Sequence, residues 1–426
     1  MNVFILHPIL DDTTTLSQRK NATYYLEEAI GLATAIHLNV RGTRLVHLKK
    51  AHPKMLIGKG LVEELTFLKE DEAQDFDLFF VNANLTPVQQ RNLEQALDVK
   101  VIDRTGIILE IFGERAQTKE GTLQVDLAAL SYQRSRLVRG WTHLERQRGG
   151  GAFTGGPGEK QIELDRRMID QQINRIKKQL KEVERTRKLH RESRTKVPYP
   201  IIALVGYTNA GKSTLFNRLT GADVFVQDQV FATLDPTMRQ IKLPSGDKVI
   251  LSDTVGFISD LPTHLVAAFK STLDEVIFAD IILHVRDWHD PNREAHADDV
   301  LKTLKALDVN IHEDEHILKV CNKIDLVDKC ETPLKKTHSN QCFVSAITGE
   351  GMPDLLEKID QILSKQYETY TLSFNISRGD ILSWFHDHAH ILAQKNDGTH
   401  FYLKLKISAK NINRAALYFK NEWVML

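Results

Sequence analysis

One short segment of the chain has the residue types and the spacing of a loop that binds nucleotide phosphates. Gly206–Ser213 reads GYTNAGKS, and it lies between the apolar run Ile201–Val205 and the amphipathic run Thr214–Leu219. This order predicts a strand, a glycine-rich loop and a helix, in which backbone N–H groups and the positive end of the helix dipole face a phosphate. We expect Lys212 to reach the β- and γ-phosphates and the Ser213 hydroxyl to ligate magnesium.

Three further strings follow apolar runs, and they indicate that the base is guanine. Asp253 begins a DTVG string that ends at Gly256. We expect its carboxylate to reach magnesium through water and the Gly256 N–H to sense the γ-phosphate. An NKID string ends at Asp325, whose carboxylate accepts two hydrogen bonds from guanine N1 and N2, whereas adenine offers no matching donors.

The size of this preference follows from the strength of charge-assisted hydrogen bonds. Losing one costs roughly 1.5–3 kcal/mol, so we expect GTP to be preferred over ATP by about tenfold to several hundredfold. The Ser-Ala pair that ends at Ala346 is expected to offer a backbone N–H to guanine O6. The predicted nucleotide-binding residues are Gly206, Tyr207, Thr208, Asn209, Ala210, Gly211, Lys212, Ser213, Thr214, Asp253, Gly256, Asn322, Lys323, Asp325, Ser345 and Ala346.

Together these strings resemble the guanine-nucleotide-binding domain (G domain) of the translation-factor-like GTPases. The resemblance implies that Thr233, in the string FATLDPT, is the switch threonine that closes over magnesium and the γ-phosphate, with Thr237 as the alternative. It implies a catalytic set of Lys212, Thr233 and Gly256. The implied magnesium ligands are Ser213, Thr233 and, through water, Asp253.

Two positions bear on how fast GTP is hydrolysed. In Ras-like proteins a glutamine follows the DxxG glycine and orients the attacking water, but Phe257 stands here. Because an aromatic ring cannot hydrogen-bond to water in this way, we expect a low intrinsic rate and a partner that completes the site. Asn209 resembles the loop asparagine that holds potassium in cation-dependent GTPases; the alternative is that it only caps the turn.

The elements that must position these residues fall into several parts. Strand-like runs such as Leu78–Val81 alternate with helix-like runs such as Pro87–Leu97 and predict an α/β domain around a mostly parallel sheet. Thr86 and Gln89 predict a capping box at the start of the second run. A nucleotide site at the carboxyl edge of this sheet stays open as an alternative, without a recognisable motif.

Two stripes of apolar residues then predict two long helices on either side of the glycine-rich segment Gly149–Gly158. The predicted fold class is therefore α/β: a P-loop G domain with an N-terminal parallel-sheet α/β domain, a long antiparallel helical hairpin and a small C-terminal α+β domain. The expected boundaries are 1–110 for the N-terminal domain, 111–196 for the hairpin, 197–365 for the G domain and 366–426 for the C-terminal domain.

The hairpin is also where positive charge collects. Residues 133–196 hold 18 Lys and Arg against 8 Asp and Glu, although the whole chain has 56 of each. Such an excess fits either a solvated helix surface or binding to a phosphate backbone. The candidate RNA-binding residues are Arg134, Arg136, Arg139, Arg146, Arg148, Gly150, Phe153, Lys160, Arg166 and Arg167. Phe153 either stacks on an exposed base or packs against the hairpin.

The glycine-rich tip, the basic hairpin and the strings FATLDP and DTVGF together resemble HflX, a bacterial GTPase family, over essentially the whole chain. The resemblance implies a protein that binds the large ribosomal subunit, hydrolyses GTP faster when bound to it, and splits stalled or idle ribosomes, particularly in heat stress. Two alternatives remain from other classes: a ribosome assembly or RNA-remodelling NTPase, and a membrane-associated regulatory GTPase.

Composition limits the remaining choices. Three cysteines without a C-x-x-C pair are typical of a reduced, cytoplasmic protein and give no sign of a zinc site. No apolar run approaches the roughly 20 residues that span a bilayer, so we expect no integral membrane segment, which leaves only peripheral membrane association. No long uninterrupted coiled coil demands a dimer, and we expect a monomer.

Overall fold

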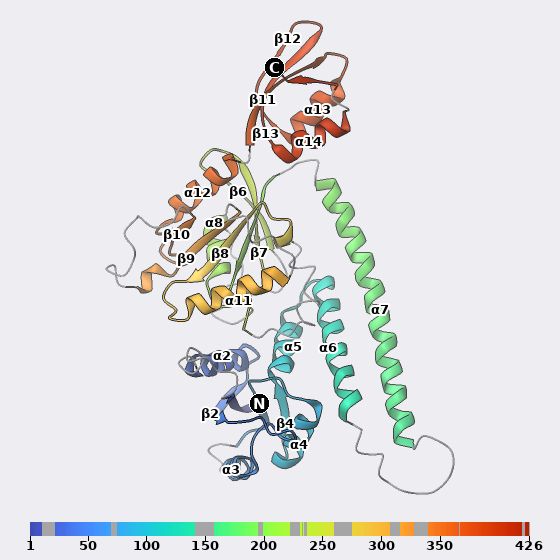
Figure 1. Ribbon diagram of the computed structural model, residues 1–426, viewed down its shortest axis with the longest axis vertical. Coiled ribbons are helices and arrows are strands. Elements are labelled where there is room, and N and C mark those ends of the chain that lie inside the picture. Colours follow the sequence, from blue (N-terminus) through green and yellow to red (C-terminus); the bar gives the residue numbers. More distant parts are fainter. Residues whose placement is uncertain are drawn as a thin grey trace.

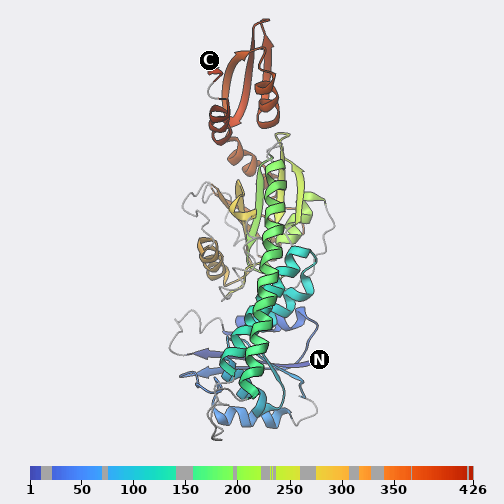
Figure 2. The same ribbon diagram turned by 90° about the vertical axis from the view of Figure 1, so that its right-hand side faces the viewer.

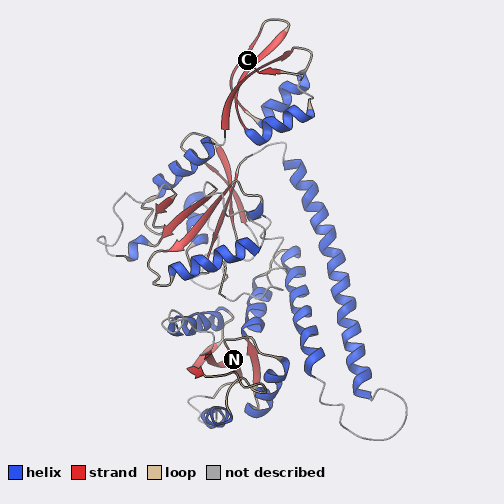
Figure 3. Ribbon diagram, in the orientation of Figure 1, coloured by secondary structure: helices blue, strands red, loops and turns tan. Residues whose placement is uncertain are grey.

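The computed structural model places the chain in an elongated arrangement of four parts (Figures 1 and 2). It describes residues 1–10, 22–69, 75–140, 157–194, 199–221, 231, 233, 237–259, 275–306, 316–327, 340–365, 367–419 and 422–425. The N-terminal domain and the C-terminal domain lie at opposite ends, with the G domain between them. Figure 3 shows that helices and strands alternate in the first and third parts, whereas the second part is helical.

The N-terminal domain is a four-stranded parallel sheet in the order β2-β1-β3-β4. Its strands are β1 (Asn2–Leu10), β2 (Asn39–Leu48), β3 (Leu78–Val81) and β4 (Lys100–Asp103). Its helices are α2 (Ala22–Ala35), α3 (Lys59–Lys69), α4 (Pro87–Leu97) and α5 (Arg104–Arg115). The predicted parallel α/β domain is confirmed. Helix α5 runs from Arg104 to Arg115 and so spans the expected boundary at residue 110, which stays a prediction.

The predicted capping box at the start of α4 is confirmed in detail. The Thr86 hydroxyl accepts from the Gln89 N–H at 3.2 Å, and the Gln89 side chain accepts from the Thr86 N–H at 2.9 Å. Two backbone donors that the first turn leaves without helical partners are thereby satisfied.

The hairpin consists of α6 (Lys119–Gly140) and α7 (Pro157–Arg194); α6 lies beside one part of the longer α7, which continues past it toward the C-terminal domain (Figure 1). An ion pair of 2.9 Å between Arg134 of α6 and Asp170 of α7 crosses this contact. The predicted pair of long helices is confirmed. The segment 141–156, which contains most of the glycine-rich tip, lies outside the described residues.

The G domain is built on a six-stranded sheet in the order β10-β9-β8-β5-β7-β6, in which only β6 runs antiparallel to its neighbour. Its strands are β5 (Ile201–Gly206), β6 (Thr237–Lys242), β7 (Lys248–Asp253), β8 (Ile281–Asp287), β9 (Ile317–Asn322) and β10 (Gln341–Phe343). Its helices are α8 (Lys212–Thr220), α11 (Arg293–Ala306) and α12 (Met352–Lys365), with the 3-10 turn η2 (Ile324–Leu326) after β9. The phosphate loop, the DTVG string and the NKID string thus all follow carboxyl ends of parallel strands, where α/β sheets bind ligands.

One hydrophobic cluster is shared between the N-terminal domain and the G domain. It contains Ile107 and Phe112 from α5 together with Val205, Phe231 and Phe257 from the G domain, all of them buried. The opposite face of each sheet has a core of its own, covered by α3 and α4 in one domain and by α8 and α12 in the other. These two domains are therefore joined by a common core as well as by the chain.

The C-terminal domain is an antiparallel sheet in the order β12-β13-β11-β14 with two helices on one face. Its elements are β11 (Tyr367–Asn375), α13 (Gly379–His388), β12 (His390–Asn396), β13 (His400–Ser408), α14 (Ala409–Tyr418) and β14 (Val424–Met425). The α+β expectation is confirmed. Across the described residues, no helix has the length and apolar character needed to cross a membrane.

The capping box gives a prediction about stability. Thr86→Ala removes the hydroxyl that caps α4 and is expected to lower the free energy of unfolding by about 1 kcal/mol. Thr86→Ser retains a capping hydroxyl and serves as the matched control. Urea unfolding followed by circular dichroism measures both variants; equal stability of the Ala variant and the parent would contradict the prediction.

Candidate nucleotide-binding site

The phosphate loop connects β5 to α8, and two of its glycines are required by their surroundings. A Cβ atom on Gly206 would lie 2.2 Å from the carbonyl oxygen of Val285 in the neighbouring strand β8. Gly211 has a φ of +86°, and a Cβ there would lie 2.3 Å from Nδ2 of Asn322. Larger residues would therefore push apart the strand ends that hold the loop.

The remaining loop residues lie between β5 and the first turn of α8. Thr208 and Ala210 are buried in the loop, and Thr214 is half-buried in the first turn of α8. Asn209 is exposed and has a left-handed backbone with a φ of 59°. Asparagine tolerates this conformation better than most residues, so the backbone alone accounts for an asparagine here.

Lys212 is buried at the start of α8, with its ammonium group inside the loop. Nζ donates to the carbonyl oxygens of Gly206 at 3.1 Å and Tyr207 at 2.8 Å. Burial lowers the pKa of Lys212 to about 8, and the nearby Asp253 carboxylate acts in the opposite direction. The side chain is therefore mostly charged at neutral pH and faces the loop that would receive phosphates.

Three oxygen-bearing side chains meet on the other side of Lys212. The Ser213 hydroxyl lies 2.8 Å from the Thr233 hydroxyl and donates to Asp253 Oδ2 at 2.8 Å. Thr233 donates to the same oxygen at 2.9 Å. The structure thus brings together all three side chains predicted to hold magnesium. Thr237, the alternative switch threonine, begins β6 and pairs with Asp253 in the sheet.

The Asp253 carboxylate itself has an unusual environment. Burial raises its pKa, while Lys212 and the Ser213 and Thr233 hydroxyls lower it. Its Oδ1 atom is buried, and no hydrogen bond reaches it from the part of the chain that the structure describes. A buried acceptor without a partner is costly, so this oxygen fits a site for a cation or its bound water.

Asn322 connects the phosphate loop to the base-recognition strings. Its Nδ2 donates to the Ala210 carbonyl oxygen at 2.9 Å, and its Oδ1 accepts from the Ala346 N–H at 3.0 Å. The N–H that we expected to face guanine O6 is thus directed at Asn322 in this structure. Ser345 is buried and accepts from the Thr348 N–H at 3.1 Å.

The two charged residues of the NKID string differ in exposure. Lys323 has a left-handed backbone, with a φ of 66°, and its Nζ lies 2.7 Å from Asp287 at the end of β8. Asp325 is exposed on η2. The carboxylate predicted to select guanine is therefore free of the sheet and open to a base.

Phe257 lies beside the phosphate loop through its backbone. Its N–H donates to the Gly206 carbonyl oxygen at 3.1 Å, and its carbonyl oxygen accepts from the Thr208 N–H at 2.7 Å. The ring is buried in the core shared with the N-terminal domain. The position at which Ras-like proteins carry a water-orienting glutamine thus contributes to packing, and Gly256 is fixed next to the loop.

Tyr207 belongs to the phosphate loop, but its hydroxyl points to another domain. It donates to Glu28 of α2, lies 2.7 Å from the Ser259 hydroxyl and accepts from the Ser259 N–H at 2.9 Å. Burial, and then the Glu28 carboxylate, raise the pKa of Tyr207 far above its usual value, so the hydroxyl stays protonated. Tyr207 therefore connects the phosphate loop to the N-terminal domain.

Arg104, the first residue of α5, completes this cluster. It forms a buried ion pair of 2.7 Å with Glu28 and donates to the Asn82 side chain at 2.6 Å and the Ser259 carbonyl oxygen at 3.0 Å. Asn82 follows β3 and Arg104 follows β4, so protein side chains occupy this carboxyl edge of the N-terminal sheet. Sequence reasoning missed Glu28, Arg104 and Ser259, because no motif marks residues so far apart in the chain.

The predicted RNA-binding residues separate into groups in the structure. Arg166 and Arg167 are exposed on α7, and Arg134 is half-exposed in its ion pair with Asp170. Arg139 lies in α6 and Lys160 in α7. Arg146, Arg148, Gly150 and Phe153 lie outside the described residues.

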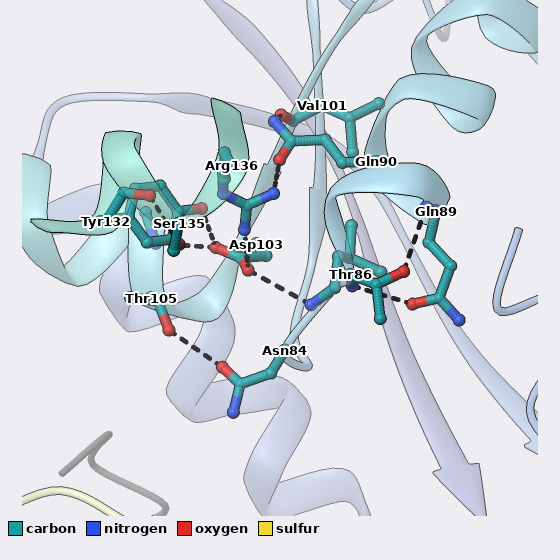
Figure 4. A network of polar contacts seen from close by, with 12 residues as sticks. Asn84, Thr86, Gln89, Gln90, Val101, Asp103, Thr105, Tyr132, Ser135 and Arg136 are labelled. Carbon is teal, nitrogen blue, oxygen red and sulfur yellow. Dashed lines mark hydrogen bonds and ion pairs between the residues drawn. The ribbon is translucent and has the colours of Figure 1, made fainter. Parts of the chain in front are cut away.

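Arg136 differs from the other arginines because its guanidinium is bound within the protein. It donates to Asp103 at 2.5 Å and to Gln90, and it lies over the Tyr132 ring (Figure 4). Only 18% of its side chain is exposed. Counting charges along the sequence cannot distinguish this arginine from those that face solvent.

The exposed Asp325 gives a prediction about the base. Asp325→Asn removes a charged acceptor for two guanine donors and is expected to weaken GDP binding by about tenfold or more. The same change introduces an amide donor that matches the carbonyl at C2 of xanthine, so xanthosine diphosphate should bind more tightly than to the parent. Fluorescence titration with both nucleotides measures this, and unchanged GDP affinity would contradict the role of Asp325.

Family descriptions match nearly the whole chain in four consecutive pieces. Residues 23–113 match a GTP-binding GTPase N-terminal region, 115–194 a GTP-binding GTPase middle region, 201–323 a 50S ribosome-binding GTPase, and 332–416 an HflX C-terminal domain. The order of the matches is the order of the four parts of the fold.

Two named relatives show the same family. GTPase HflX of Magnetococcus marinus is 50% identical over 86% of this chain and 84% of its own, and GTPase HflX of Escherichia coli is 44% identical over 79% of each. Among solved structures, a GTP-binding protein from Sulfolobus solfataricus in complex with GDP is 23% identical with a TM-score of 0.44, over 86% of this chain and 99% of that chain. The four family matches and the identity to the two HflX relatives show that the chain belongs to the HflX family of GTPases.

Proposed function

We propose that this GTPase is a molecular switch that binds the large ribosomal subunit and separates stalled or idle ribosomes into subunits, particularly in heat stress. The observation that carries the proposal is the joining, in one chain, of a GTP site that has Phe257 at the position of the water-orienting glutamine to a long, basic helical hairpin. The match of residues 201–323 to a 50S ribosome-binding GTPase description supports the choice of partner.

Magnesium is the proposed metal, and the site fits it. Ser213, Thr233 and the buried Asp253 carboxylate supply oxygen atoms, the ligand type that Mg²⁺ prefers, within hydrogen-bond distance of one another. When bound, the ion would neutralise charge on the β- and γ-phosphates. A potassium ion at Asn209 is a separate proposal that rests on resemblance, and its test is turnover in potassium against sodium chloride at equal ionic strength.

The residues of the site divide the work of hydrolysis. Lys212 supplies a positive charge inside the phosphate loop, and Gly256 is fixed beside the loop by the backbone pairing of Phe257. Thr233 closes the site from the switch segment. None of these groups orients a water molecule, so the intrinsic rate is low and the ribosome completes the site. Only a difference in ribosome affinity between the GTP and GDP states can drive release.

The hairpin is the proposed RNA-binding element. Arg166 and Arg167 on α7 are exposed and available for phosphate contacts, and Arg134 needs only to exchange its contact with Asp170. Arg139, Arg146, Arg148 and Lys160 are proposed for the same role, with Gly150 and Phe153 at the tip. Arg136 is bound to Asp103, so an RNA contact would require that buried ion pair to open.

The proposed setting is the cytoplasm, with the protein acting as a monomer. Cys321 and Cys342 are both buried free thiols, which agrees with a reducing environment. Peripheral association with a membrane is the alternative, and flotation with liposomes tests it.

The proposal predicts that large ribosomal subunits stimulate GTP turnover by about tenfold or more. Arg166→Glu with Arg167→Glu reverses two charges on α7 and is expected to remove most of that stimulation and to flatten its dependence on salt, because fewer phosphate contacts release fewer counterions. A variant lacking Gly149–Gly158 is expected to behave similarly. Phosphate release is measured with and without subunits.

The matched control reverses two exposed charges at a distance from the hairpin. Lys395→Glu with Lys404→Glu, on β12 and β13, is expected to retain the stimulation. Absence of stimulation in the parent protein would contradict the ribosome as the activating partner. Equal binding of the GTP- and GDP-loaded protein to large subunits would contradict the switch.

A further inference from the structure

Helix α5 contacts both segments that we expect to respond to the γ-phosphate. At its first residue, Arg104 donates to the carbonyl oxygen of Ser259, three residues after Gly256. Near its other end, the Phe112 ring packs edge to face against Phe231, with ring centres 4.7 Å apart. Phe231 is two residues before Thr233. A single helix of 12 residues therefore touches the chain beside each switch residue.

The same helix is bound to the hairpin at its N-terminus. Asp103 caps α5 by accepting from the Gly106 N–H at 2.8 Å. Its two carboxylate oxygens also accept from the Tyr132 hydroxyl and the Arg136 guanidinium, both at 2.5 Å and both from α6 (Figure 4). Helix α6, the first helix of the hairpin, is thus bound to Asp103, the N-cap residue of α5.

Asp103 and Arg104 are consecutive residues, and they face different partners. The first holds α6, whereas the second holds Ser259 and the Glu28 carboxylate that accepts from the Tyr207 hydroxyl. Exposure of their side chains is only 2% and 5%. Since close-packed interiors shift between discrete arrangements and do not deform continuously, α6 cannot move far while α5 and the switch segments stay in place.

We propose that α5 couples the position of the helical hairpin to the nucleotide state, with Asp103 and Arg104 as positioning residues for GTP hydrolysis. This coupling is a property of the isolated GTPase and goes beyond the proposed ribosome role. The expected sign of the coupling follows from the geometry. Helix α5 packs against Phe231, and Thr233 in the same segment lies at Ser213 and Asp253. A switch threonine there stabilises bound GTP more than bound GDP.

The test removes the hold of α6 on Asp103 in the full-length protein. Tyr132→Phe with Arg136→Gln deletes the hydroxyl and the charge that bind Asp103, without touching the nucleotide site. We expect the dissociation constant of a fluorescent non-hydrolysable GTP analogue, divided by that of the matching GDP derivative, to rise by about fivefold or more. Misfolded protein lowers the active fraction for both nucleotides equally, so the ratio responds to coupling and not to stability.

The matched control removes a different contact of α6, the one with α7. Arg134→Gln removes the ion pair between α6 and α7, which does not involve α5, and the ratio should stay within about twofold of the parent value. An unchanged or lowered ratio in the Tyr132→Phe, Arg136→Gln variant would overturn the proposal. Ribosome stimulation that persists alongside such a result would leave the proposed function intact.

A double-mutant cycle and a hydrogen-exchange measurement test whether the coupling extends across α5. Tyr132→Phe and Tyr207→Phe remove hydroxyls that bind different acidic residues, Asp103 and Glu28. If α5 couples them, the fold-changes in the affinity ratio should depart from simple multiplication by about threefold or more. Because coupling is reciprocal, the GTP analogue should also protect α6 amides from hydrogen exchange more than GDP does. The coupling would be overturned if the two fold-changes simply multiply and α6 amides exchange at the same rate with the GTP analogue and with GDP.

Discussion

The guanidinium of Arg104 is a charge buried between two domains, and the arrangement around the nucleotide depends on how that charge is satisfied. Glu28 supplies the counter-charge, and Asn82 and the Ser259 carbonyl oxygen accept further hydrogen bonds. An ion pair in such a place is only acceptable with near-complete hydrogen bonding, and removing one partner typically costs about 3–5 kcal/mol. The segment after Gly256 is therefore bound, through Ser259, to the same buried guanidinium as Glu28.

The apolar surroundings make this constraint effective. Phe257, Phe231 and the inner face of α5 exclude water from the cluster, and hydrogen bonds in such an environment are stronger than in solvent. The phosphate loop therefore faces both the position of the nucleotide and the N-terminal domain. Lys212 lies where the phosphates are expected, while the hydroxyl of Tyr207, a residue of the same loop, donates to Glu28 of the N-terminal domain.

Much of the fold and most of the nucleotide site could be predicted from the sequence, because local rules govern them. The motifs follow strand ends, so their meeting at one edge of a sheet follows from the parallel order of the strands. Thr86 and Gln89 lie three residues apart, which is why the sequence predicts the capping box. The motifs predict Ser213 and Asp253 at the magnesium position, whereas the choice of Thr233 depends on resemblance; the three side chains lie within hydrogen-bond distance of one another.

The rest depends on contacts between residues that are distant in the chain. Nothing near Glu28 or Ser259 signals that they share the hydroxyl of Tyr207. The sequence reports the charge of Arg136 and not its exposure, so it predicts an RNA-binding arginine where the structure has a guanidinium paired with Asp103. Phe257 was recognised as unable to orient water, but its backbone pairing with the phosphate loop leaves no trace in residue type.

The core shared by the first and third parts of the chain has a consequence for synthesis on the ribosome. Domains generally fold from the N-terminus as the chain emerges, yet the partners of Ile107 and Phe112 include Phe231 and Phe257, which are made more than a hundred residues later. During that interval α5 packs only against side chains of the first two parts of the chain, such as Leu32 and Val125, and the part of its surface that later contacts Phe231 and Phe257 stays exposed. The G domain then packs against the exposed part of α5. The C-terminal domain has a separate core and folds independently.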